Sequence, residues 1–89
     1  MAENRHRISL RDVDPARYAD DWADIVRERS WGDALAVQEA SLEGIRPYQM
    51  VRVTRLVKEW SLPGDPSIAA VVENTNEHVI RYLLEEMDA

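Results

Sequence analysis

The densest group of chemically active side chains is a set of carboxylates in the N-terminal third. Asp20, Asp21 and Asp24 lie close together, and Asp12 and Asp14 precede them. Carboxylate oxygens are the ligands that Ca²⁺ prefers, but a calcium loop needs acids at alternate positions, a central glycine and a terminal glutamate. Neither group has this arrangement. We therefore expect a solvated acidic loop here and no metal site.

The histidines and serines form no recognisable catalytic pattern either. His6 and His78 are far apart in the sequence, and there is no cysteine to join them in a metal site. Serine catalysis needs a base and an orienting acid at suitable spacing, yet the chain has no glycine-flanked serine and no phosphate-binding glycine loop. We expect no enzyme activity, no catalytic residue and no cofactor. The function should lie in what the chain binds.

Size and composition indicate one small domain. The chain has 89 residues and a hydrophobic fraction of 45%, which is ordinary for a globular protein and argues against disorder throughout. So short a chain has no room for a second core. Residues 1–89 are therefore expected to form a single domain, with residues 1–5 flexible. A small core also leaves a homo-oligomer open.

Charge and hydropathy argue against two classes of partner. Seventeen acidic residues and eleven basic ones give a net charge of −6, whereas nucleic-acid binding needs a cationic surface. No segment approaches the run of about 18 apolar residues that a membrane span requires. The N-terminal residues lack the apolar core of a signal peptide, so the chain is expected in the cytoplasm of the cell that makes it.

The N-terminal third has the alternation of a short β element. In residues 6–13, Ile8 and Leu10 alternate with polar residues, which is the period of a half-buried strand. Residues 22–28 fit either a strand or one face of a helix. We favour a strand, because it would pair with the first one in a hairpin. If they are helical, residues 6–13 form a single strand.

The rest of the chain carries helix signals. Ser30 can cap a helix over residues 31–43, and Gly44 follows as a helix terminator. A second helix is predicted over residues 47–60, where proline is tolerated in the first turn. A third is predicted over residues 76–87, which have a wide apolar face. The predicted fold class is mainly α: a small helical domain with a short N-terminal β element.

The predicted core follows the apolar stripe of the second helix and the wide face of the last one. Met50, Val53, Val57 and Trp60 are spaced by three or four residues, as on one side of a helix. With so few elements, these faces have no other adequate partner than each other. The residues expected at the centre of the core are Leu35, Met50, Val53, Leu56, Val57, Trp60, Ile80, Leu83 and Leu84.

The apolar residues left over are candidates for a partner-binding surface. If the helices satisfy one another, the apolar residues that precede them need either the underside of that core or another protein. Tryptophan is enriched both in small cores and at the centres of interfaces. The candidate partner-binding surface consists of Trp22, Ile25, Val26 and Trp31.

Three segments in order resemble the tail assembly chaperones of long-tailed bacteriophages and related prophages. Residues 24–33 read DIVRERSWGD, similar to that family's strand followed by an aromatic-Gly-Asp helix start. Residues 53–62 end in EWSL, which resembles its closing Trp-polar-Leu element. Residues 62–66 read LPGDP and residues 80–87 read IRYLLEEM, similar to its proline-containing spacer and last helix. The similarity spans most of residues 6–88.

This resemblance implies a viral protein without enzymatic activity. Proteins of that family bind the apolar-rich tape-measure protein in the cytoplasm of the host bacterium and keep it soluble during tail assembly. A small acidic protein with surplus apolar faces is compatible with that role. Two alternatives remain open: a small structural subunit of a phage neck or tail, and an acidic inhibitor or antitoxin that covers a cationic surface.

Overall fold

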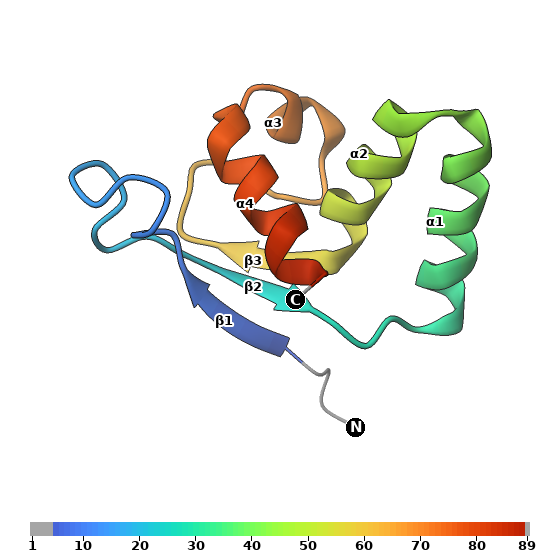
Figure 1. Cartoon of the computed structure of the whole chain (residues 1–89), viewed down its shortest axis with the longest axis horizontal. Coiled ribbons are helices and arrows are strands. Elements are labelled where there is room, and N and C mark those ends of the chain that lie inside the picture. The colour runs from blue at the N-terminus through green and yellow to red at the C-terminus, as the bar shows by residue number, and fades with distance from the viewer. Residues whose placement is uncertain (1–4, 89) are drawn as a thin grey trace.

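The computed structural model describes residues 5–88, which form an α+β fold with a three-stranded antiparallel sheet (Figure 1). Residues 1–4, which hold most of the segment expected to be flexible, lie outside the described residues, and Arg5 already belongs to the first strand. The elements in chain order are β1 (Arg5–Ser9), β2 (Trp22–Val26), α1 (Trp31–Glu43), α2 (Ile45–Leu56), β3 (Val57–Trp60), α3 (Ala69–Glu73) and α4 (Glu77–Met87).

The expectation of a mainly α domain is wrong, because the predicted helix over residues 47–60 ends early. Helix α2 stops at Leu56, and the chain continues directly into β3, which pairs with β2. The four residues of β3 are VKEW, of which valine and tryptophan are residue types that favour strands. The β element is therefore a sheet whose third strand comes from the middle of the chain.

A β-bulge explains why β3 has the residue spacing of a helix. Ile25 pairs with Val57 and Ala23 pairs with Trp60, so two steps along β2 correspond to three steps along β3. The extra residue restores the alternation, and both β3 side chains point to the same face. Val57 and Trp60 are both buried there. A spacing of three that looks helical in the sequence thus belongs to a bulged strand.

The first two strands form the hairpin favoured from the sequence. β1 and β2 pair in antiparallel register, with His6 opposite Ile25 and Ile8 opposite Ala23. The prediction that residues 22–28 contain a strand is confirmed. β1 is shorter than predicted, because the chain turns after Leu10, whose carbonyl accepts a hydrogen bond from the Val13 N–H at 3.0 Å.

The boundaries of α1 follow from its caps, as predicted. The Ser30 hydroxyl accepts a hydrogen bond from the Asp33 N–H at 3.1 Å, which satisfies one of the free donors of the first turn. Gly44 ends the helix with φ of 130°, a conformation that L-residues with side chains rarely adopt. This single residue separates α1 from α2, and Pro47 lies in the first turn of α2. This short connection therefore holds the two helices next to each other.

The helices lie on one side of the sheet and build the core against it (Figure 1). Arg52 of α2 is buried and donates to the Asp88 carboxylate at 2.6 Å, beside the end of α4. Arg27, just after β2, pairs with Glu86 of α4 at 3.1 Å. These two contacts fasten the C-terminal helix to α2 and to the sheet. The main core cluster contains Leu10, Tyr18, Ala23, Ile25, Val53, Val57, Trp60, Val72, Val79 and Leu83.

Most of the predicted core is confirmed, with one error. Five predicted residues are buried and three pack against the cluster while partly exposed: Val53, Leu56, Val57, Trp60 and Leu83, then Met50, Ile80 and Leu84. Leu35 is the error, because its side chain is 39% exposed on the outer side of α1. The residues that replace it come from the hairpin, above all Leu10, Ala23 and Ile25, which are fully buried.

Candidate functional site

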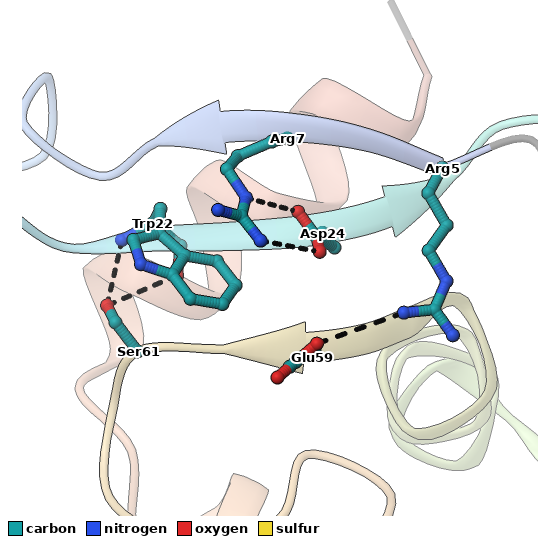
Figure 2. Close-up of polar contacts among 6 residues, drawn as sticks. All are labelled: Arg5, Arg7, Trp22, Asp24, Glu59 and Ser61. Atoms are coloured by element: carbon teal, nitrogen blue, oxygen red, sulfur yellow. Dashed lines mark hydrogen bonds and ion pairs between the residues drawn. The ribbon is translucent and has the colours of Figure 1, made fainter.

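The face of the sheet that the helices leave open carries an ordered set of polar contacts (Figure 2). Arg7 donates to both carboxylate oxygens of Asp24, at 2.8 and 3.1 Å, across the β1–β2 pair. The same guanidinium lies 3.7 Å from the centre of the Trp22 ring. Such a stacked, bidentate arginine is held at a fixed position by its two partners. The contact therefore fixes the register of the hairpin.

A second ion pair crosses the same face. Arg5 of β1 approaches Glu59 of β3 at 3.9 Å. The Ser61 hydroxyl then closes the β2–β3 end of the sheet, since it accepts from the Trp22 N–H at 2.9 Å and donates to Asp21 at 2.8 Å. Figure 2 shows the charged groups of the two pairs over the strands, with Arg7 turned toward Asp24 and Arg5 toward Glu59. We interpret this face as a surface whose charged side chains pair with one another within the chain.

The pairing of Asp24 should be visible as a dependence of stability on pH. The hydrogen bonds from Arg7 lower the pKa of the Asp24 carboxyl, with burial acting in the opposite direction. A carboxylate with a lowered pKa contributes stability that is present above its unfolded value, near pH 3.9, and is lost as pH falls through the folded pKa. Asp24→Asn should therefore lower the free energy of unfolding by about 1–2 kcal/mol at neutral pH.

Urea denaturation at a series of pH values tests this expectation. The difference between Asp24→Asn and the parent should shrink as pH falls below about 4, because the unfolded parent then binds a proton at Asp24 before the folded parent does. Asp20→Asn is the matched control, since Asp20 is exposed in the loop between β1 and β2. A constant difference between Asp24→Asn and the parent down to low pH would contradict the assignment.

Metal-ligand groups and the pKa of Tyr82 show what chemistry the ionisable side chains of residues 5–88 could do. Within residues 5–88, no three His, Asp or Glu side chains lie close enough to hold a metal ion. Tyr82 lies beside His78 in a shallow pocket of about 340 Å³. Burial raises the pKa of Tyr82 to about 12, with the nearby Glu86 and Asp12 carboxylates adding to the effect. At neutral pH this phenol stays protonated, so it is neither a base nor a nucleophile.

The four residues predicted as a partner-binding surface do not share one surface. Trp22 is half-buried on the open face of the sheet, under Arg7. Ile25 is fully buried in the core, and Val26 is 6% exposed. Trp31 is 80% exposed at the start of α1. Neighbouring residues of a strand point to opposite faces, so this part of the sequence is divided between the two sides of the sheet. Only Trp31 of the four is freely accessible.

Trp31 instead begins an exposed apolar stripe along α1. Leu35 follows it four residues later, and Leu42 and Ile45 are 85% and 64% exposed. The stripe is continued in the middle by Gln38, which is exposed as well. Spacings of four, three, four and three residues place these side chains on one side of the α1 helix and at its corner with α2. We call Trp31, Leu35, Gln38, Leu42 and Ile45 the α1 stripe.

The opposite side of α1 is lined by small residues and faces α2. Ala34 is half-buried, and Val37 and Ala40 are buried. Asp33 is tied to Arg55 of α2 at 3.1 Å. Figure 1 shows α1 at the edge of the molecule, with α2 between it and α4. Among the described elements, α2 is the only one with an extensive contact to α1.

The sequence contains a signal for this stripe, but the signal does not tell which side of the helix faces the core. The spacing of residues 31, 35, 38, 42 and 45 is that of a helix face. Leu35 is predicted in the core because the helix faces of so short a chain have no other adequate partner than each other, but it belongs to this outer stripe. The small residues of the opposite side, Ala34, Val37 and Ala40, form the inward face.

A second accessible surface is a broad groove between α2, α3 and α4, with a volume of about 1260 Å³. Its apolar floor includes Met50, Ile80 and Leu84, which are the partly exposed members of the predicted core. Charged side chains stand at its rim, among them Arg81, which pairs with Glu77 at 3.6 Å. The groove can accept apolar side chains of a partner, but its rim carries both positive and negative side chains.

Neither the structure nor the comparisons assign the chain to a known family. None of the helices between residues 5 and 88 has both the length and the apolar character needed to cross a bilayer. No protein-family model matches the chain, and searches of curated proteins and of solved structures returned no match.

Proposed function

We propose that this protein is a non-enzymatic assembly chaperone of a bacteriophage tail, which binds an apolar helical segment of the tape-measure protein on the α1 stripe. The observation that carries the proposal is the distribution of exposed apolar side chains. Of the five large hydrophobic residues exposed within residues 5–88, four lie on α1 or at its corner with α2, and the fifth is Ile68. A surface of this kind, gathered on one element, is typical of a protein-binding site.

The geometry suits a helical client. The α1 stripe is a straight row of side chains on a helix whose one extensive contact within residues 5–88 is with α2, on the opposite side. A second amphipathic helix can lie along such a row and bury its own apolar face against it. Helix packing of this kind needs no reacting group.

The charge of the protein suits the same role. A net charge of −6 on 89 residues keeps small proteins apart in solution by mutual repulsion. A complex of an aggregation-prone client with several such proteins would carry their negative charge and be kept apart from other complexes by the same repulsion. The resemblance of residues 24–33, 53–62, 62–66 and 80–87 to tail assembly chaperones supports the tape-measure protein as the client and the cytoplasm of the host bacterium as its place.

Co-expression with the tape-measure protein of the same phage tests the proposal. The parent should keep that protein in the soluble fraction and co-purify with it. The double variant Leu35→Ser/Leu42→Ser should lose more than about 90% of the co-purified client, because it removes about 3–4 kcal/mol of apolar contact. Its melting temperature should stay near the parent's, since both side chains are exposed.

Ile68→Ser is the matched control for this experiment. It also removes an exposed aliphatic side chain, but one that is far from α1 in the chain and follows the β3–α3 turn. It should retain the client. Equal recovery of the client with the double variant and with the parent would contradict the proposal. Mass spectrometry of purified phage particles separates a chaperone, which leaves before completion, from a structural subunit, which remains.

A further inference from the structure

We infer that the helix bound on the α1 stripe carries basic residues along one flank of its apolar face, and that these pair with Glu39 and Glu43; this rests on the proposed function. Helix α1 contains three acidic residues and no basic one. Asp33 is already neutralised by Arg55. Glu39 and Glu43 are exposed, and no ion pair within residues 5–88 involves either of them.

The two glutamates border the apolar residues directly. Glu39 lies four residues after Leu35 and three before Leu42, so its side chain flanks the stripe between them. Glu43 lies one turn further along the same flank. A partner helix that covers Leu35 and Leu42 must therefore bring its own flanking residues close to both carboxylates.

In the free protein, the positions of Glu39 and Glu43 are electrostatically unfavourable. Like charges four residues apart on a helix repel each other by a few tenths of a kcal/mol. They also lie in the C-terminal half of α1, where the helix dipole favours cations, and the last turn has no basic residue. The charges of the two glutamates therefore do not stabilise the helix that carries them. Cations from a partner would remove both the repulsion and the clash with the dipole.

The opposite flank of the α1 stripe and its apolar row determine the remaining features of the partner helix. On the other side of the stripe lies the small, exposed residue Ser41, which allows a helix to approach closely. The partner is therefore an amphipathic helix with a row of large apolar side chains and with Lys or Arg on one flank. An acidic flank would face Glu39 and Glu43 and be repelled.

Two synthetic helices test the inference by titration calorimetry against the purified full chain. Both have about 20 residues and the same leucine row, long enough for helix formation, and one carries Lys at the flanking positions where the other carries Glu. The lysine peptide should bind about tenfold more tightly to the parent, because each charge pair contributes up to about 1 kcal/mol. Salt at about 0.5 M should remove most of that preference.

The double variant Glu39→Gln/Glu43→Gln should reduce the preference for the lysine peptide to less than about threefold while binding is retained. Asp20→Asn/Glu85→Gln is the matched control, since it changes the net charge equally at exposed sites outside α1, and it should keep the tenfold preference. Equal affinity for the two peptides, or a preference for the glutamate peptide, would overturn the inference and leave the proposed function standing.

Failure of the proposed function has a different signature. It would follow from binding of neither peptide by the parent, or from binding that survives Leu35→Ser/Leu42→Ser. The last measurement is the tryptophan emission of the protein with phosphatidylcholine vesicles. A blue shift of tryptophan emission with vesicles, in a protein that ignores both peptides, would show that the exposed Trp31 enters a lipid surface and would overturn both proposals.

Discussion

Trp60→Ala is expected to lower the free energy of unfolding by about 3–5 kcal/mol, the range typical of a large buried aromatic residue. The Trp60 side chain is 6% exposed and lies on the inner face of β3, opposite Ala23 of β2. Its indole Nε1 donates to the Gly64 carbonyl oxygen at 2.9 Å, which ties the strand to the following turn. The substitution removes the ring, leaves a cavity and breaks this contact.

Urea denaturation followed by circular dichroism measures the loss. Small domains have total stabilities near the lower end of about 5–15 kcal/mol, so Trp60→Ala should be largely unfolded at 37 °C. Trp60→Phe is the control that keeps most of the ring and removes the hydrogen bond to Gly64. It should be destabilised by clearly less than Trp60→Ala. A Trp60→Ala variant that melts within a few degrees of the parent would place the ring outside the core.

Ile25→Asp is expected to prevent folding altogether. Ile25 is fully buried between the sheet and the helices, where it belongs to the main core cluster. Aspartate at this position loses the apolar contacts and places a carboxylate where it has neither water nor a cation. The combined cost is at least about 4 kcal/mol, which is comparable with the entire stability of a domain of this size.

Leu35→Asp is the matched substitution for Ile25→Asp, at a residue that is partly exposed. Leu35 is 39% exposed on α1, so the carboxylate remains hydrated and the stability should change by less than about 1 kcal/mol. The helical circular-dichroism signal should be near the parent's in Leu35→Asp and lost in Ile25→Asp. The reverse result would place Leu35 in the core and Ile25 on the surface, as the sequence alone had suggested.

The local features of the fold could be predicted because neighbouring residues determine them. Ser30 caps α1 through a hydrogen bond to the Asp33 N–H three residues away, and Gly44 ends the same helix. The boundaries of α4 are likewise close to the predicted residues 76–87. In each case the hydrogen-bonding group or the backbone conformation depends on a side chain within one turn.

The third strand could not be predicted, because its conformation depends on residues far away in the sequence. β3 pairs with β2 across the whole α1–α2 hairpin. Its bulge gives Val57 and Trp60 the spacing of a helix face, and the preceding Val53 of α2 continues the same pattern. Only the partner strand distinguishes the two conformations. A pattern of apolar residues alone therefore extends the helix by one turn too many.

The candidate site was missed for a related reason. The α1 stripe has a clear helical period, but α1 also has apolar residues on its opposite side. The one-residue connection at Gly44 forces α1 and α2 together, and such close helices need small side chains at their contact. Ala34, Val37 and Ala40 meet that need, which turns Leu35 outward. The expectation that the helix faces have only each other as partners places Leu35 in the core instead.

Within residues 5–88, α1 has its one extensive contact with α2, and this gives its outer side unusual evolutionary freedom. Trp31, Leu35, Gln38 and Leu42 are exposed there, so most substitutions of them should be nearly neutral for folding. Selection can then change the recognised partner without first compensating a loss of stability. The same scaffold could follow a rapidly diverging client, or be redirected to a new one by randomising a few positions of one helix.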